Sequence, residues 1–170
     1  YDKMGMMPEV KMLGQFLAAM IVIKSGVRVE FLHNYYLDTL FTYLWIVGIT
    51  NAFNLLDNMD GLSCGVAAIA SLVLFLCSLL LHNYEVALIS LVLSGAALGF
   101  LPHNIYPAKI FMGDCGAMFL GFTLASLAIA GTWKQASNLF IVLLMPILAL
   151  AVPIFDTAFV AITRKMDGRA

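Results

Sequence analysis

The sequence predicts an all-α integral membrane protein, a polytopic bundle of about six transmembrane helices that is part of a larger multi-span fold. Of the 170 residues, 62% are hydrophobic and 11% are charged, whereas a soluble domain is usually about 45–50% apolar and about 25% charged. Because a segment in lipid must satisfy its own backbone hydrogen bonds, spans of this composition fold as helices.

Six apolar stretches are each long enough to cross a bilayer, which takes about 20 residues. In order they cover 10–25, 37–53, 62–82, 85–102, 116–133 and 138–162, within a single transmembrane domain over 1–170. Lys11 and Lys24 bracket the short apolar core of the first stretch, and Glu85 opens the fourth. Pro146 and Pro153 interrupt the sixth, where we expect kinks.

With six spans, the connecting segments alternate between the two sides of the membrane. The segments 1–9, 54–61, 103–115 and 163–170 fall on one side. This side holds Lys3, Lys11, Lys109, Arg164, Lys165 and Arg169, whereas the other holds Lys24, Arg28 and Lys134. The positive-inside rule therefore favours the first side as the cytoplasmic one.

Acidic residues that are distant in the sequence also converge on this side. The segment NAFNLLDNMDG (51–61) spaces Asn54, Asp57 and Asp60 three apart, so on a helix they share a face. Asp2 and Asp114 fall on the same side of the membrane. Two carboxylates on one face repel each other unless a cation or a proton lies between them. A solvated helix end is the alternative interpretation of Asp57 and Asp60.

The second polar motif, HNIYPAKIFMGDCGA (103–117), places Asp114 near the start of the fifth span. The helix dipole favours an acid there, so a simple helix cap is one interpretation. With Asp57 and Asp60 on the same side, a divalent metal site becomes the better one. Oxygen ligands without a cluster of His or Cys indicate Mg²⁺ or Mn²⁺, and Mg²⁺ is commonly held by one or two carboxylates plus substrate phosphates.

The motifs NAFNLLDNMDGL and NIYPAKIFMGDCG resemble those of the polyprenyl-phosphate N-acetylhexosamine-1-phosphate transferases, glycosyltransferase family 4. In that family they usually read N-A-x-N-L-x-D-G-x-D-G-L and N-x-x-P-A-x-x-F-M-G-D-x-G. The start, YDKMGMMPEVKMLGQ, resembles the tail of the family's DDxxD segment, and PIFDTAFVAITRKMDGRA resembles the stretch before its His-rich loop. The departures are Asn58 for the usual Gly, Cys64 for Ala, and Cys115 with Ala117 for a Ser pair.

The resemblance implies a role for each site residue. It implies Asp114 as the Mg²⁺ ligand and three catalytic acids in the same cleft: Asp2, Asp57 and Asp60. The substrate-binding set implied by the resemblance comprises Asn54 and Asn104 as polar contacts to the nucleotide-sugar, Phe111 as a ring that stacks on uracil, and Lys109 as a phosphate contact. Asp156 lies within an apolar run and is a functional candidate without an assigned role.

The implied reaction transfers N-acetylglucosamine-1-phosphate from UDP-GlcNAc to undecaprenyl phosphate, giving the undecaprenyl-diphosphate sugar and UMP in cell-envelope polysaccharide synthesis, of lipopolysaccharide or teichoic acid. The expected partners are a UDP-sugar, a polyprenyl phosphate lipid, the membrane and a second copy in a homodimer. The expected location is the bacterial cytoplasmic (inner) membrane, with the site facing the cytoplasm. Nucleic acid is excluded as a partner, because the chain has no basic run.

Three other interpretations stay open at this point. The runner-up enzyme is a phospho-N-acetylmuramoyl-pentapeptide transferase of peptidoglycan synthesis. A transporter is disfavoured, because the acids lie at span ends on one side rather than at mid-span. The third is a catalytically inactive membrane fragment, since we expect a chain without the first two acids of DDxxD and without the His-rich loop to be inactive alone.

Overall fold

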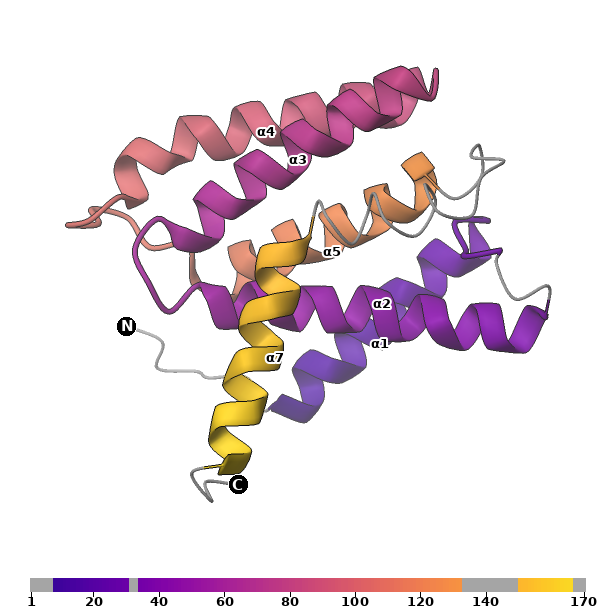
Figure 1. The fold of residues 1–170 in the computed structure, drawn as a ribbon, viewed down its shortest axis with the longest axis horizontal. Coiled ribbons are helices and arrows are strands. Elements are labelled where there is room, and N and C mark those ends of the chain that lie inside the picture. Colours follow the sequence, from indigo (N-terminus) through magenta and orange to yellow (C-terminus); the bar gives the residue numbers. More distant parts are fainter. Residues whose placement is uncertain (1–7, 31–33, 133–149, 167–170) are drawn as a thin grey trace.

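The computed structural model describes residues 8–30, 34–132 and 150–166, and the regular elements in these ranges are helices (Figure 1). In chain order they are α1 (Pro8–Lys24), α2 (Tyr35–Leu56), α3 (Leu62–Leu80), α4 (Tyr84–Asn104), α5 (Gly113–Thr132) and α7 (Ala151–Met166). The all-α prediction is thus confirmed for the described residues.

Helices α3 and α4 form an antiparallel hairpin that lies along one edge of the molecule in Figure 1. Residues 81–83 form its turn, and Asn83 accepts a hydrogen bond from the Val86 backbone N–H at 3.4 Å, which caps α4. The Asn83 amide also donates to the Ala130 carbonyl at 3.1 Å. The turn is therefore attached to the far end of α5.

Helices α2 and α5 form the centre of the bundle and pack closely along their length. Gly121 makes this approach possible, because a Cβ there would lie 2.9 Å from both Thr50 Cα and Phe53 Cβ. Phe53 is fully buried at this contact. Since α2 and α5 run antiparallel, the end of α2 and the start of α5 meet at one end of the bundle (Figure 1).

Four of the described helices are long and apolar enough to cross a membrane: α2, α3, α4 and the 113–131 part of α5. Helix α1 has 17 residues and α7 has 16, fewer than the ~20 that a span usually needs. The expected six spans are therefore only partly confirmed. The first half of the sixth predicted span, with Pro146, lies outside the described residues.

The expected kink at Pro153 is wrong. Pro153 lies in the first turn of α7, where its missing N–H has no intrahelical partner to lose. The helix continues to Met166 and packs against α2, which it crosses steeply in Figure 1. The position of a proline within a helix, rather than its presence, thus decides whether the helix bends.

Candidate active site at the α2–α3 and α4–α5 loops

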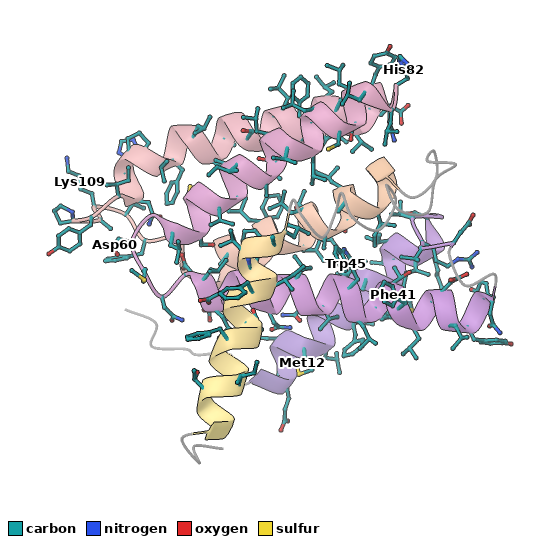
Figure 2. The ribbon with its side chains drawn as sticks, in the orientation of Figure 1. Met12, Phe41, Trp45, Asp60, His82 and Lys109 are labelled. Carbon is teal, nitrogen blue, oxygen red and sulfur yellow. The ribbon has the colours of Figure 1, made fainter. Side chains whose placement is uncertain are left out.

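The two polar motifs fold into loops that are hydrogen-bonded to each other. Residues 57–61 join α2 to α3, and residues 105–112 join α4 to α5. The Asp60 carboxylate accepts a hydrogen bond from the Ala108 backbone N–H at 3.1 Å. Segments more than forty residues apart therefore lie at the same end of the bundle, as the alternation of the spans predicts (Figure 2).

Asn104 is the second bridge between the loops. Its Oδ1 accepts from the Gly61 backbone N–H at 3.1 Å, and its Nδ2 donates to the Ile110 carbonyl at 3.0 Å. The side chain is buried, with 3% of its surface exposed. Asn104, assigned to nucleotide-sugar contact from the sequence, thus has both polar atoms hydrogen-bonded to the backbone of the loops.

Gly61 closes the first loop in a conformation that favours glycine. Its φ is +75°, in the left-handed region, and it serves as the N-cap of α3. A Cβ at this position would also lie 3.5 Å from the Ile105 Cα of the second loop. A side chain here would therefore be strained in its backbone and would touch the facing loop.

Asp57 and Asp114 meet between these loops. Asp57 follows the last residue of α2, and its carboxylate accepts a hydrogen bond from the Gly113 backbone N–H at the start of α5. Burial raises the pKa of Asp57 above its usual value; the hydrogen bond from Gly113 lowers it, and the neighbouring Asp114 charge raises it further. The two carboxylates are therefore near enough for the charge of Asp114 to act on the partly buried Asp57.

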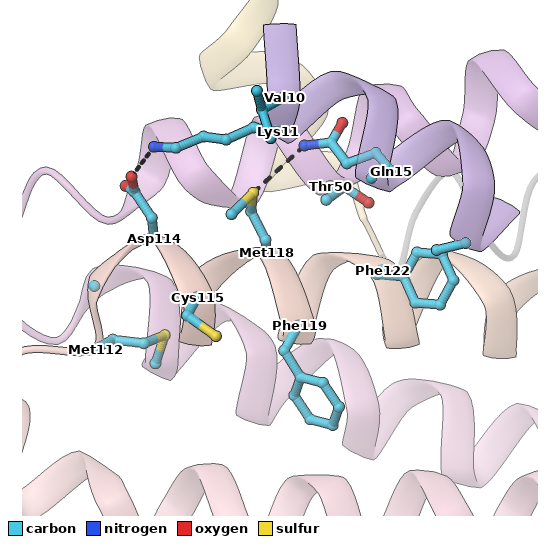
Figure 3. A pocket seen from close by; sticks show the side chains of 13 residues that line it. Val10, Lys11, Gln15, Thr50, Met112, Asp114, Cys115, Met118, Phe119 and Phe122 are labelled. Atoms are coloured by element: carbon cyan, nitrogen blue, oxygen red, sulfur yellow. Dashed lines mark hydrogen bonds and ion pairs between the residues drawn. The ribbon is translucent and has the colours of Figure 1, made fainter. Parts of the chain in front are cut away.

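Lys11 of α1 completes this charged cluster. Its ammonium forms an ion pair with the Asp114 carboxylate (Figure 3), and the Lys11 side chain is 22% exposed. From its sequence position, Lys11 is expected only at the end of a span on the cytoplasmic side, without a role in the site. Its position on the same side as the acids could have indicated a role in the site. A local sequence pattern, however, does not indicate which acid a lysine pairs with.

An apolar groove of about 680 Å³ leads away from the cluster between α1, α2 and α5. Lys11 and Asp114 line one end, and Ala18 and Phe122 lie about two turns further along α1 and α5 (Figure 3). Gln15 is a polar group within the groove. The site therefore joins paired charges to a surface that suits a hydrocarbon chain.

The remaining predicted residues have different surroundings. Phe111 is 74% exposed, and Lys109, two residues before it, is also exposed at the loop surface. Asn54, one turn before Asp57, has a buried Oδ1 without a hydrogen-bond partner among the described residues. Asp156 lies on α7 and is half-buried. Asp2 lies outside the described residues.

Residues 2–132 match the family described as glycosyl transferase family 4. The chain belongs to glycosyl transferase family 4. That assignment covers both loops, the Lys11–Asp114 ion pair and the whole groove.

Among curated members of this family, the chain is 39% identical over 175 residues to a probable undecaprenyl-phosphate N-acetylglucosaminyl 1-phosphate transferase of Bacillus subtilis (strain 168), covering 98% of this chain and 48% of the relative. It is 36% identical to a decaprenyl-phosphate N-acetylglucosaminephosphotransferase of Mycolicibacterium smegmatis, covering 99% of this chain and 48% of that relative. The chain spans about half the length of these relatives.

A phospho-N-acetylmuramoyl-pentapeptide-transferase of Limosilactobacillus fermentum is also similar, at 39% identity over 131 residues. That match covers 74% of this chain and 41% of the relative. The chain is therefore similar to relatives whose names carry two different sugars.

The carboxylates of this site fit a hard divalent cation that takes its remaining ligands from water and substrate. Among residues 8–30, 34–132 and 150–166, no three His, Cys, Asp or Glu side chains are grouped closely enough to hold a metal by themselves. Asp57 and Asp114 supply two neighbouring carboxylates. One or two carboxylates completed by water and substrate phosphates are a usual set for Mg²⁺.

Proposed function

We propose that the full-length protein containing this chain transfers N-acetylglucosamine-1-phosphate from UDP-GlcNAc to a polyprenyl phosphate. The observation that supports this most is the meeting of Asp57, Asp114 and Lys11 at the end of an apolar groove. A polyprenyl phosphate needs both features, because its phosphate must reach charged groups while its tail stays in the bilayer. The names of the Bacillus and Mycolicibacterium relatives support the choice of sugar.

In the proposed reaction, an oxygen of the lipid phosphate attacks the β-phosphorus of the nucleotide-sugar. A new P–O bond forms, the bond from the β-phosphorus to the oxygen that bridges the two phosphates breaks, and UMP leaves with that oxygen. Such transfers depend mostly on positioning and on neutralising charge. The Lys11 ammonium supplies one fixed positive charge beside Asp114, and the exposed Phe111 ring offers a face for the uracil.

Asp57 and Asp114 would hold Mg²⁺, which when bound neutralises the diphosphate and polarises its oxygens. The buried Asn54 Oδ1 adds an acceptor for a donor group of the nucleotide-sugar. Asp60 is hydrogen-bonded to the second loop, so we propose that it supports the site through the position of that loop. The proposed location is the bacterial inner membrane, with both loops facing the cytoplasm.

The second candidate is a phospho-N-acetylmuramoyl-pentapeptide transferase, which the similarity to the Limosilactobacillus fermentum relative favours. The two candidates share lipid, chemistry and carboxylates, and they differ in the sugar. Purified full-length protein would be given undecaprenyl phosphate, Mg²⁺ and either labelled UDP-GlcNAc or labelled UDP-N-acetylmuramoyl-pentapeptide. Label transferred to lipid from the first donor alone supports the first proposal, and label from the second donor alone supports the other.

The metal assignment has its own test in the Asp114→Asn variant. This change removes the charge but keeps the shape of the side chain, and we expect Mg²⁺-dependent transfer to fall at least ~100-fold, since metal stabilisation of the transition state is worth several kcal/mol. Membrane insertion should be unchanged. The matched control is Glu30→Gln, an exposed acid paired with Arg28 after the far end of α1. Transfer by Asp114→Asn at the unaltered rate would contradict the assignment.

A further inference from the structure

A pair of side-chain amides joins α1 to α2 inside the bundle, below the charged cluster. Asn51 Nδ2 donates to Gln15 Oε1 at 2.8 Å, and Gln15 Nε2 donates to Asn51 Oδ1 at 3.3 Å. Gln15 is 7% exposed. Each amide therefore supplies both the donor and the acceptor that the other needs.

Gln15 also reaches the third wall of the groove. Its Nε2 lies 3.4 Å from Met118 Sδ on α5 (Figure 3). One turn earlier on both helices, Lys11 meets Asp114 in the same way. Because both pairs are separated by 103 residues in sequence, α1 and α5 run in parallel with matched register across the groove.

Lys11 is on the same helix as these contacts. Lys11 and Gln15 are four residues apart and therefore share one face of α1. Much of the outer surface of α1 carries exposed apolar side chains such as Leu13, Leu17 and Ile21, whose contacts are non-directional. A buried amide, in contrast, must find a hydrogen-bond partner of defined geometry. The reciprocal pair is satisfied in only one register of α1 against α2.

We propose that Gln15 and Asn51 are positioning residues, which hold α1 at the height where the Lys11 ammonium meets Asp114. The amide pair has no contact with reacting atoms in this proposal and acts only through Lys11. Its effect on catalysis rests on the proposed transferase function. The register itself does not depend on that function and can be measured separately.

The register is tested by cross-linking in the full-length protein, in a background without reactive cysteines. Lys11→Cys and Asp114→Cys are bridged by a short bifunctional thiol reagent, with and without Gln15→Leu/Asn51→Leu. We expect the apolar double replacement to lower the cross-linking rate at least fivefold. The control is Ser71→Ala, which removes a buried hydroxyl bonded within α3 and should leave the rate unchanged. An unaltered rate in the Leu/Leu variant would overturn the proposal.

The catalytic consequence is tested by a double-mutant cycle in the enzyme with native Lys11 and Asp114. Gln15→Leu should lower kcat by about 10- to 100-fold with little change in KM for the nucleotide-sugar, since misplacement by about 1 Å can cost up to 100-fold. Adding Gln15→Leu to Lys11→Met should cause no further loss, because no ammonium is left at position 11 for Gln15 to position. Losses that multiply would show that Gln15 does not act through Lys11.

The exchange variant Gln15→Asn/Asn51→Gln serves as the rescue. It keeps two facing amides and the same total number of methylene groups. We therefore expect it to recover most of the rate that is lost by Gln15→Asn alone or by Asn51→Gln alone. A failure to recover would count against the register mechanism. If the wild-type enzyme transfers no sugar phosphate at all, the proposed function fails, and the cross-linking rates still decide the positioning role.

Discussion

At the scale of single residues, the site contains two kinds of polar side chain. Asp57 is partly desolvated and lies near the charge of Asp114, whereas Asp60 and Asn104 are hydrogen-bonded to backbone groups of the facing loop. The spacing of the motifs does not distinguish these two pairs, because it shows only where the polar residues stand along the chain and not which groups they contact. We infer that the first pair serves the substrate and the second pair holds the loops together.

Asn104→Ala tests this division. The change leaves the Gly61 N–H and the Ile110 carbonyl without their partner, and an unsatisfied buried polar group costs about 1–3 kcal/mol. We therefore expect a lower melting temperature of the detergent-solubilised protein and faster proteolysis within 57–61 and 105–112. Phe111→Ala is the matched control, because its exposed ring should affect substrate affinity and leave the melting temperature unchanged. Equal melting temperatures for both variants would refute the structural role of Asn104.

At the scale of helices, the close packing of α2 against α5 brings the two acids together. Gly121 lies where a Cβ would meet Thr50 Cα at 2.9 Å and the Ile49 carbonyl at 3.1 Å. Both are backbone atoms of α2, so they cannot rotate away. A larger residue must therefore move the helices apart, and with them Asp57 and Asp114.

Gly121→Ala should accordingly destabilise the protein by about 1–3 kcal/mol, as overpacking of a filled core does. Transfer activity should fall as well, because the acids separate. Gly99→Ala on α4 is the control, since a Cβ there has no neighbour within 4 Å and alanine is the better helix former. Thermal unfolding of the two variants side by side measures the difference. A Gly121→Ala variant as stable as Gly99→Ala would contradict the packing argument.

At the scale of the whole molecule, the fold has two ends with different chemistry. The loops 57–61 and 105–112, the ion pair and one end of the groove lie at one end. The turn at 81–83 and the start of α2 lie at the other. In the sequence, the segments that hold these loops belong to the side with more basic residues, which favours this end as the cytoplasmic one.

This orientation predicts a labelling pattern in membrane vesicles. Asn58→Cys, in the exposed first loop, should react with a membrane-impermeant maleimide in inside-out vesicles and stay unlabelled in right-side-out ones. Tyr36→Cys, 82% exposed at the start of α2, should show the reverse. Both variants would carry the single cysteine in a cysteine-free background. Labelling of both from the same side would refute the topology.

Several features follow from local sequence patterns. Apolar length located five of the helices to within a few residues, because a helix in lipid needs only a continuous run of suitable side chains. At their C-terminal ends, α2 and α4 extend beyond the predicted spans into the polar motifs, by residues 54–56 and 103–104. Their starts are set by the N-caps Asn34 and Asn83. The kink at Pro153 failed because the start of α7 was placed too early.

By itself, the sequence determined that this is a helical membrane protein, that Asp57, Asp60 and Asp114 lie at span ends connected on the same side, and which family its motifs resemble, since each depends on composition or on spacing along a short segment. Only the tertiary structure decided that Asp57 lies within reach of the Asp114 charge, that Lys11 pairs with Asp114, and that Gln15 and Asn51 join two helices. The physical reason is that these contacts connect helices whose register is set by packing. A contact between residues 103 positions apart produces no periodic pattern in the sequence.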